Sequence, residues 1–294
     1  MSLNLLALAN LNSLDGLSTL NTWLNYVVFE SYLPALVIYF GMTLSAFFVF
    51  WIWYRKQMQP LRIQQKQRSN VSQWRKEIKN SLISIGIFGL IDLGIYLAKQ
   101  QGLTSLYDDV SQYGIPYLLV SIILMLFWQD TFFYWAHRLM HWKALYKFSH
   151  KVHHDSIDTS PFTAYSFHPV EAIVEALPDL IVVFILPVHF WALLGYQSAS
   201  MLMNVIGHLG YEIIPQSWTR HGLGKWKTPS THHNMHHSKV NGNYGLYFRF
   251  WDVLMGTEFK DYESTLDVVY ERSRQTQNQT RISKVKPQST LTIT

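Results

Sequence analysis

Long apolar runs separated by polar segments dominate the chain. The first uncharged run covers residues 33–54, about the twenty residues needed to cross a bilayer core, and it ends in aromatic residues typical of a membrane interface. Similar runs over about 81–98 and 115–135 predict a second and a third membrane-spanning helix. The pattern therefore predicts an all-α, multi-pass membrane protein.

A fourth apolar region, residues 172–210, differs from the first three. Pro178 and Pro187 interrupt its first part, and proline kinks or breaks a helix. The region is long enough for a helical hairpin that dips into the bilayer or crosses it twice. We therefore expect a polytopic helical bundle with about four spans or span-like hairpins.

The polar segments differ in charge, and charge predicts their side of the membrane. Residues 55–79 hold eight Lys or Arg against one acid, Glu77, a net charge of +7 that exceeds the +5 of the whole chain. A basic segment can bind nucleic acid, but between two apolar spans it more often reflects the positive charge of cytoplasmic loops. We place this segment in the cytoplasm and expect no nucleic-acid partner. The 99–114 link then faces outward, and the third span returns the chain to the cytoplasmic side just before His137.

The composition agrees with a membrane protein. Hydrophobic residues make up 49% of the chain and charged residues 15%, against roughly 25% charged in ordinary soluble domains. Asp92 lies inside the second predicted span and must face protein or water, because a carboxylate in lipid is costly. The chain has no Cys, which excludes disulfides, thiolate metal clusters and iron–sulfur centres.

Histidines gather in two stretches, residues 137–154 and 231–237, that follow the predicted spans. Offsets of three and four residues put side chains on one face of a helix, so each stretch should present its imidazoles in one direction. The spaced histidines are His137, His141, His150, His153, His154, His233, His236 and His237. One zinc takes about four protein ligands or fewer, so this number predicts two metal ions. Imidazole suits iron, copper, zinc and nickel.

These motifs resemble the fatty acid hydroxylase and sterol desaturase superfamily. The resemblance covers about residues 127–257 and rests on one HxxxH motif and two HxxHH motifs. Stretches that match beside them are DTFFYWAHR (130–138), HKVHH (150–154), HPVE (168–171) and NYGLYFRFWDVLMGT (243–257). The resemblance implies a membrane-bound non-haem di-iron oxygenase that uses O2 and external electrons. Its substrate would be a fatty-acyl or sterol-like lipid, hydroxylated or desaturated at an unactivated C–H bond.

The resemblance also implies a further ligand between the two HxxHH motifs. His208 matches that position, and Asn204, one turn earlier, stands where some relatives have another histidine. The expected metal ligands are His137, His141, His150, His153, His154, His208, His232, His233, His236 and His237. His232 is either a ligand or a donor behind the ligands. His168 either binds metal or caps the helix that Pro169 opens.

A ligating imidazole usually donates its second ring nitrogen to a carboxylate, carbonyl or water that fixes its orientation. Among the nearby acids we expect Asp130 and Asp252 to take this part. The other acids near the motifs are Asp155, Glu171, Glu175 and Glu212. His168 and Asn204 are further candidates for supporting the ligands.

The sequence contains no electron source of its own. It has neither a GxGxxG nucleotide fingerprint nor cysteines for an iron–sulfur centre, so we expect a separate donor such as a ferredoxin, a cytochrome or a reductase. Two other classes remain open. A membrane zinc hydrolase would normally carry HExxH, and a non-catalytic metal-binding or transport protein would place its ligands within the spans.

The chain divides into segments by composition. We expect an extracytoplasmic N-terminal segment (1–31), membrane spans with the basic loop (32–126), a catalytic domain (127–260) and a polar tail (261–294). In the catalytic domain, a helical cap at the cytosolic face would carry the dimetal site. The tail beyond Glu271 is rich in Gln, Thr, Ser and Lys, which predicts disorder.

Overall fold

The computed structural model describes residues 14–66 and 69–285, and within them the fold is helical apart from two short strands. The first helical stretch consists of α2 (Leu14–Asn25), η1 (Tyr26–Tyr32), α3 (Leu33–Ala46) and η2 (Phe47–Trp53). Its two η elements are wider, π-helical turns. The first predicted span lies inside this stretch, so the boundary expected after residue 31 falls within a helix. Residues 1–13 of the expected N-terminal segment lie outside the described part.

Three helices of the described chain are long and apolar enough to cross a membrane. They are Ser18–Trp53, α5 (Val71–Gln100) and α6 (Gly114–Met140). Asn70 starts α5 by accepting the Gln73 N–H at 3.0 Å, which satisfies one amide of the first turn. Large apolar residues such as Val37 and Leu90 are exposed, as expected for faces that meet lipid. The three predicted apolar helices are therefore present, each long enough to span a bilayer.

The predicted hairpin over 172–210 is present as α9 (Pro169–Ile185) and α10 (Phe190–Gly207). Between these helices, β2 (Val188–His189) pairs in parallel with β1 (Leu106–Tyr107). This pairing joins the turn of the hairpin to the link between α5 and α6, which also contains the short turn η4 (Val110–Gln112). In the interior, α9 packs on α5 and α10 packs on α6. The hairpin thus widens the bundle of spans.

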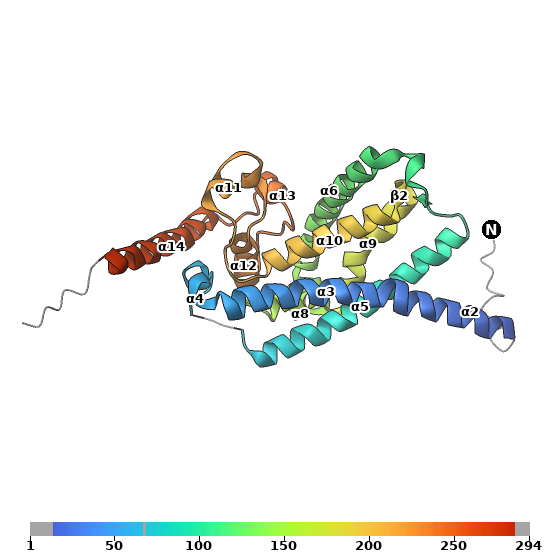
Figure 1. Ribbon diagram of the computed structural model, residues 1–294, viewed down its shortest axis with the longest axis horizontal. Helices are drawn as coiled ribbons and strands as arrows, with labels where there is room; N and C mark the ends of the chain where they lie inside the picture. Colours follow the sequence, from blue (N-terminus) through green and yellow to red (C-terminus); the bar gives the residue numbers. More distant parts are fainter. Residues whose placement is uncertain (1–13, 67–68, 286–294) are drawn as a thin grey trace, which may run out of the picture.

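The remaining helical elements connect the long helices or follow α10, and those after α10 form a cap. In Figure 1, α11, α12, α13 and α14 gather at the left, whereas α2 and β2 lie toward the right. The cap elements after α10 are α11 (Gln216–Arg220), η6 (Gly222–Trp226), α12 (Ser230–Lys239), α13 (Phe250–Met255) and α14 (Tyr262–Val285). Those elsewhere are α4 (Arg55–Met58), η3 (Gln59–Leu61), α7 (Lys143–Ser149), α8 (Lys151–His154) and η5 (Pro161–Tyr165).

The C-terminal tail is helical where the sequence predicted disorder. Helix α14 continues past Glu271 to Val285, and residues 286–294 lie outside the described part. Its first turns bury Leu266 and Tyr270 in a cluster with α12. Tertiary packing of an apolar face, rather than composition, supplies most of the stability of such a helix. The composition of the later turns therefore gave the wrong prediction.

A buried ion pair fastens the basic segment to the cap. Nη2 of Arg62 lies 2.6 Å from each carboxylate oxygen of Asp158, and both side chains are almost fully buried. The guanidinium also packs 4.4 Å from the centre of the Trp51 ring and donates to the carbonyl of Gly210. Gly210 has a φ of +77°, and a Cβ there would collide with Arg62, so the position requires glycine. The basic segment is therefore an integral part of the fold.

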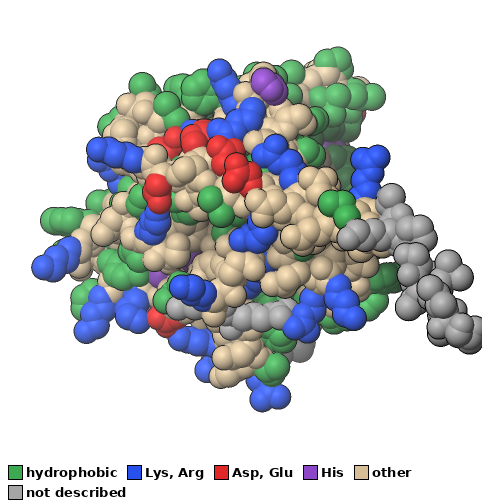
Figure 2. All heavy atoms as spheres, turned by 90° about the vertical axis from the view of Figure 1, so that its left-hand side faces the viewer, with side chains coloured by type: hydrophobic (Ala, Val, Ile, Leu, Met, Phe, Trp, Pro, Cys, Tyr) green, Lys and Arg blue, Asp and Glu red, His purple; other side chains and the backbone are tan. Residues whose placement is uncertain are grey.

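The outer face of the cap is strongly charged. Figure 2 shows this face, with Lys and Arg side chains spread across it and a group of acidic side chains among them. Two ion pairs connect the cap elements to α14, Arg220 with Asp267 at 2.5 Å and Arg249 with Glu263 at 2.9 Å. Such a surface suits water rather than lipid.

Replacing Asp158 with alanine should destabilise the protein strongly. The substitution leaves the charge of Arg62 buried without its carboxylate, so we expect the free energy of unfolding to fall by about 3–5 kcal/mol. Asp261→Ala removes the exposed partner of Lys239 and is the control, with an expected loss of about 1 kcal/mol or less. Unfolding of the detergent-purified variants measures both. Equal stability of the two variants would contradict the role of the buried pair.

Candidate metal centre

Buried histidines form two adjoining groups, one of five and one of four residues. In each group, one ring nitrogen per residue lies within 4.8 Å of the corresponding nitrogens of the others. The first group is His137, His141, His150, His154 and His236. The second group is His153, His208, His233 and His237. The ends of α6 and α10 meet α8 and α12 here, which brings together segments that are far apart in the sequence.

Each HxxHH motif contributes to both groups. In the first motif, His150 and His154 join the first group and His153 joins the second; in the second motif, His236 crosses into the first group. The rings of His154 and His237, one from each group, have centroids 4.8 Å apart. In an α-helix each residue is rotated by about 100°, so the histidines three and four positions after the first one of a motif lie about 100° apart around the helix axis. The expectation that each stretch presents all its imidazoles in one direction is therefore wrong.

The spacing of the ring nitrogens fits bound metal ions. Nε2 atoms approach each other in the pairs His137–His150 (2.9 Å), His154–His236 (3.0 Å) and His208–His233 (2.9 Å). Nitrogens that bind one ion at about 2.1 Å are themselves about 3.0–3.4 Å apart in octahedral or tetrahedral geometry. The observed spacing is that of ligands around a common ion. An all-imidazole donor set suits iron, copper or zinc.

Backbone carbonyls fix the orientation of the rings. Nδ1 of His137 lies 2.8 Å from the carbonyl oxygen of Tyr244, and Nδ1 of His236 lies 2.7 Å from that of Gly242. A carbonyl oxygen only accepts, so each Nδ1 must carry the proton. The lone pair is then on Nε2, which points into the group and is free to bind metal.

Burial keeps these imidazoles neutral. Removal from water disfavours the charged form of histidine, and it lowers the pKa of His154 to about 3 and that of His208 to about 4. Burial and then the neighbouring imidazoles also lower the pKa of His153 and of His237 well below the ordinary value. Neutral imidazole is the form that binds metal, so both groups present free lone pairs at neutral pH.

Among the described residues, the carboxyl group that contacts a histidine ring of the two groups is that of Glu171. Its Oε1 lies 2.7 Å from Nδ1 of His150, and both side chains are buried. The sequence favoured Asp130 and Asp252 for this part, so that preference is corrected. Glu171 stands in the first turn of α9, and only the packing of that helix beside His150 creates the contact. HPVE was visible in the sequence, but its partner was not.

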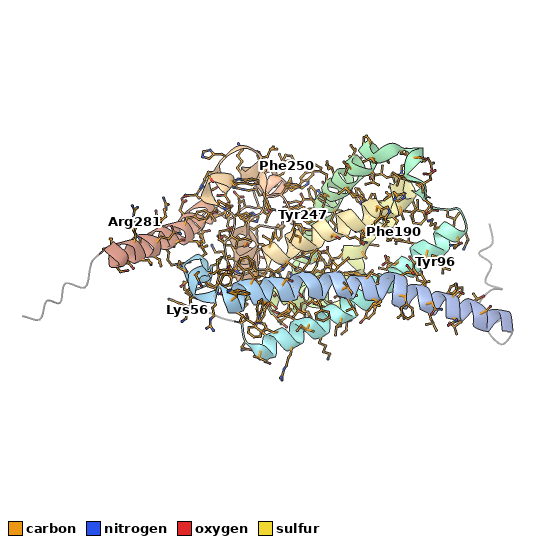
Figure 3. All side chains as sticks on the ribbon, viewed as in Figure 1. Lys56, Tyr96, Phe190, Tyr247, Phe250 and Arg281 are labelled. Carbon is orange, nitrogen blue, oxygen red and sulfur yellow. The ribbon has the colours of Figure 1, made fainter. Side chains whose placement is uncertain are left out.

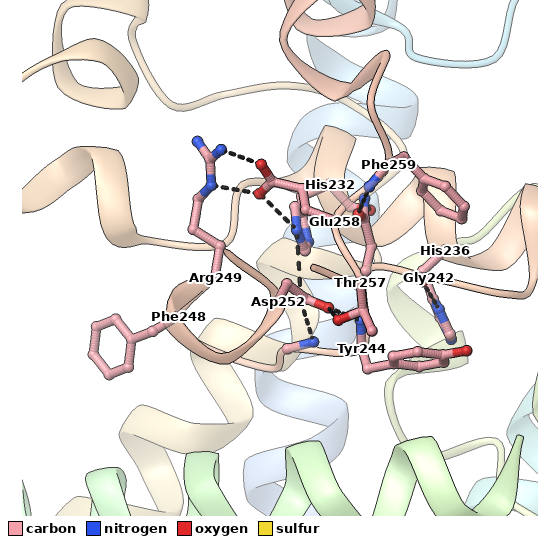
Figure 4. A network of polar contacts seen from close by, with 12 residues as sticks. His232, His236, Gly242, Tyr244, Phe248, Arg249, Asp252, Thr257, Glu258 and Phe259 are labelled. Atoms are coloured by element: carbon pink, nitrogen blue, oxygen red, sulfur yellow. Dashed lines mark hydrogen bonds and ion pairs between the residues drawn. The ribbon is translucent and has the colours of Figure 1, made fainter. Parts of the chain in front are cut away.

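Asp130 and Asp252 accept from backbone amides and contact no ring nitrogen of the two groups. Asp130 accepts the N–H groups of Tyr247 and Phe248 at 2.7 and 3.1 Å, and Asp252 accepts those of Tyr244 and Gly245 at 2.8 and 2.7 Å. In Figure 4, Asp252 lies below His232 and accepts the backbone N–H of Tyr244. The carbonyl of Tyr244 in turn orients His137. Both acids thus act on the centre through the loop that they shape.

His232 lies outside both groups. Its Nε2 is 3.8 Å from Asp252 and 3.6 Å from Glu258, and Figure 4 shows its ring between these two acids. Arg249 holds Glu258 in place from the other side, at 2.5 Å. Of the two roles expected for His232, its position outside both groups does not fit that of a ligand.

His168 and Asn204 support the centre in different ways. Nδ1 of His168 accepts the Val170 N–H at 3.2 Å, so His168 caps the start of α9. This is one of the two roles expected for His168. The backbone carbonyl of Asn204 accepts from Nδ1 of His208 at 2.9 Å, and its side-chain amide donates to the Ala164 carbonyl at 2.8 Å. The Oδ1 atom of Asn204 is buried without a hydrogen-bond partner.

Glu77 organises the loop after α8, and the sequence gave no sign of this role. Its carboxylate accepts from Ser156 at 2.7 Å, from Ser160 at 2.6 Å and from Thr163 at 2.9 Å. These bonds tie the loop to α5 and fix where α8 presents its histidines. In the sequence, Glu77 is only the single acid of a basic segment. Its partners come from a distant part of the chain, so no spacing could reveal them.

A cavity of about 560 Å³ leads from the histidines into the helical bundle. Its histidine end is lined by His150, His153, His208 and His233. Tyr96 and Phe190 line its far end, and Figure 3 labels both on the side of the bundle away from Lys56. The volume is in the range of sites that enclose a whole small molecule.

Comparisons with known proteins agree over the region of the two groups. A family model described as fatty acid hydroxylase matches residues 122–257. Lathosterol oxidase of Homo sapiens is 32% identical over 254 residues, which cover 83% of this chain and 80% of that protein. The Delta(7)-sterol 5(6)-desaturase erg3C of Aspergillus fumigatus is 31% identical over 252 residues, with 79% and 74% covered. No solved structure matches the chain.

Removing a histidine from either group should lower the amount of bound metal. We expect His236→Ala and His237→Ala each to reduce the metal content of the purified protein, because each removes one ring nitrogen from a set of four or five. His221→Ala changes an exposed histidine outside both groups and is the matched control. Elemental analysis measures the metal per chain. Wild-type content in both test variants would exclude these groups as the binding site.

The contact between Glu171 and His150 should strengthen metal binding. Glu171→Gln keeps the shape but removes the charge that orients the ring, so we expect metal affinity to fall by about 10–100-fold. Glu175→Gln, one turn further along α9, makes the same chemical change without touching a ligand and should leave the affinity unchanged. Competition with a chelator measures both. Equal affinities for the two variants would show that the contact does not serve the metal.

Proposed function

Because this chain belongs to the fatty acid hydroxylase and sterol desaturase superfamily, we propose that it is a membrane-bound di-iron oxygenase that hydroxylates or desaturates a lipid C–H bond. It would use O2 and externally supplied electrons. The observation that carries this proposal is the pair of buried all-histidine groups at the end of a cavity of about 560 Å³. Groups of five and four nitrogen donors suit two ions, and iron accepts imidazole.

The histidines of the two groups would hold the iron ions. When bound, the iron pair supplies the capacity to activate O2 and to remove hydrogen from an unactivated carbon. The residues of the chain provide the setting for this chemistry. The carbonyls of Tyr244 and Gly242 keep two lone pairs directed inward, and the contact of Glu171 with Nδ1 of His150 orients that ring.

The cavity would present the lipid to the second group and exclude bulk water. Phe133, Tyr165 and Phe167 line it near the histidines, so the reacting carbon would lie among aromatic side chains. Exclusion of bulk water from the reacting carbon would also limit side reactions. Two similar proteins are named for sterols, which supports a sterol-like substrate beside a fatty-acyl one. Hydroxylation and desaturation differ only in how the substrate carbons are placed.

We place the centre at the cytoplasmic face of a multi-pass protein. Positive charge accumulates in the cytoplasmic loops of membrane proteins, and residues 55–79 carry a large excess of it. The ion pair between Arg62 and Asp158 ties this segment to the loop that follows α8. The segment and the histidines therefore share one side of the membrane in this proposal.

The electrons would come from a separate protein. The chain has no cysteine for an iron–sulfur centre, so a ferredoxin, a cytochrome or a reductase would have to approach it. The charged outer face of the cap offers such a partner a surface outside the lipid (Figure 2). A zinc hydrolase would need no electron donor. Purified protein that holds two irons and consumes O2 only when reduced supports the oxygenase; one tightly held zinc with ester or amide hydrolysis would refute it.

Lipids extracted from cells that produce the protein test the proposal directly. We expect one lipid to gain an oxygen atom or to lose two hydrogen atoms, which mass spectrometry detects and which also separates hydroxylation from desaturation. Cells that produce His153→Ala or His236→Ala should lack the product although the variant remains inserted in the membrane. Cells that produce His221→Ala should form it. Normal product with either of the first two variants would remove that histidine from the proposed ligands.

A further inference from the structure

The cavity has a polar section beyond the histidines. Asp92, Glu175 and Asp179 line it together with Gln129 and the side chains of α10. Among the described residues that line the cavity, Lys99 is the one Lys or Arg, and it forms an ion pair with Asp108. The carboxyl groups therefore have no basic side chain to neutralise them within this section.

Asp179 is held in a fixed position. Its Oδ1 accepts from the hydroxyl of Tyr196 at 2.8 Å, and its Oδ2 accepts from the side-chain amide of Gln197 at 3.2 Å. The same hydroxyl lies 3.1 Å from Oε1 of Gln129, and Tyr196 is almost fully buried. These contacts set the carboxylate in the wall of the cavity between α9 and α10.

Two other carboxyl groups on α9 face the cavity with unused acceptors. Oε2 of Glu171 is buried and has no hydrogen-bond partner, and the residue is only 1% exposed. Glu175 lies one turn further along, and no hydrogen bond or ion pair joins it to another described residue. Glu171, Glu175 and Asp179 are spaced by four residues and so form a row along one face of the helix.

Acceptors without donors are costly in an apolar enclosure, because a buried polar group needs a hydrogen-bond partner. A ligand that brings an O–H or N–H group supplies the missing donor. A ligand that brings a carboxylate or phosphate finds no free cation here, because Lys99 is already paired with Asp108. The lining of the cavity thus favours a polar group that donates a hydrogen bond over an anionic group.

We propose that Glu175, Asp179, Tyr196 and Gln197 form a polar subsite that binds a hydroxyl or ammonium group of the lipid and rejects an anionic one. The inference rests on the proposed function and makes its substrate more specific. Glu171 touches His150, and Asp179 lies eight residues further along α9, about 12 Å at the rise of an α-helix. The subsite therefore also sets which carbon of the bound lipid reaches the histidines.

Binding of three probes of equal chain length tests the subsite. Equilibrium binding to the purified full chain is measured for 1-octadecanol, octadecylamine and octadecanoate, with no reductant present, so that no turnover occurs. We expect the alcohol or the amine to bind at least about 10-fold more tightly than the acid, the effect of one hydrogen bond to a charged group. Equal affinities for all three probes, or no measurable binding of the alcohol and the amine, would overturn the proposal.

The variants locate the effect. The double variant Glu175→Gln, Asp179→Asn should bring the ratio of the affinities close to one, whereas Asp261→Asn, which changes an exposed carboxylate of the cap, should leave it unchanged. Partial unfolding lowers binding of every probe and leaves the ratio intact. A double variant with the wild-type ratio would therefore reject the subsite.

The outcome is separable from that of the proposed function. A chain that binds the alcohol or the amine selectively but changes no lipid in cells keeps the subsite and loses the oxygenase. A chain that oxidises a lipid but shows no selectivity among the three probes keeps the oxygenase and loses the subsite.

Discussion

The burial of many neutral imidazoles side by side is the constraint on which the structure depends. Each ring must turn a lone pair inward and a proton outward, and the proton needs an acceptor behind the ring. The carbonyls of Gly242, Tyr244 and Asn204 meet that need for three rings. An uncharged donor set is also cheaper to bury than a cage of carboxylates, which allows the centre to adjoin an apolar cavity.

Polar networks behind the rings keep those carbonyls in place. Asp252 holds the amide of Tyr244, and Glu77 gathers the hydroxyl groups of the loop after α8. Such networks are stable because their members are satisfied, and they give the interior one arrangement rather than several. Helix α5 carries Glu77 beside the histidines and Asp92 beside the cavity. One rigid element thus supports both the histidine groups and the cavity.

Local signals in the sequence predicted what depends on neighbours along the chain. The apolar runs marked the three long helices and the hairpin, and the histidine offsets marked eight of the nine residues that meet in the two groups. Contacts between distant segments could not be predicted from the sequence pattern. The approach of Glu171 to His150 and the bonds to Glu77 arise only when the helices pack. The extension of α14 depends likewise on burial of its first turns, and local composition could not predict it.

Each HxxHH motif supplies histidines to both groups, so neither group can form without both motifs. A loop carrying one HxxHH motif, grafted onto another scaffold, would bring fragments of two coordination spheres and complete neither of them. No single helix or loop carries all the histidines of one group, so one group cannot be built without parts of the other. Transplanting this chemistry into a designed bundle would therefore require α8 and α12 to move as one block with the ends of α6 and α10.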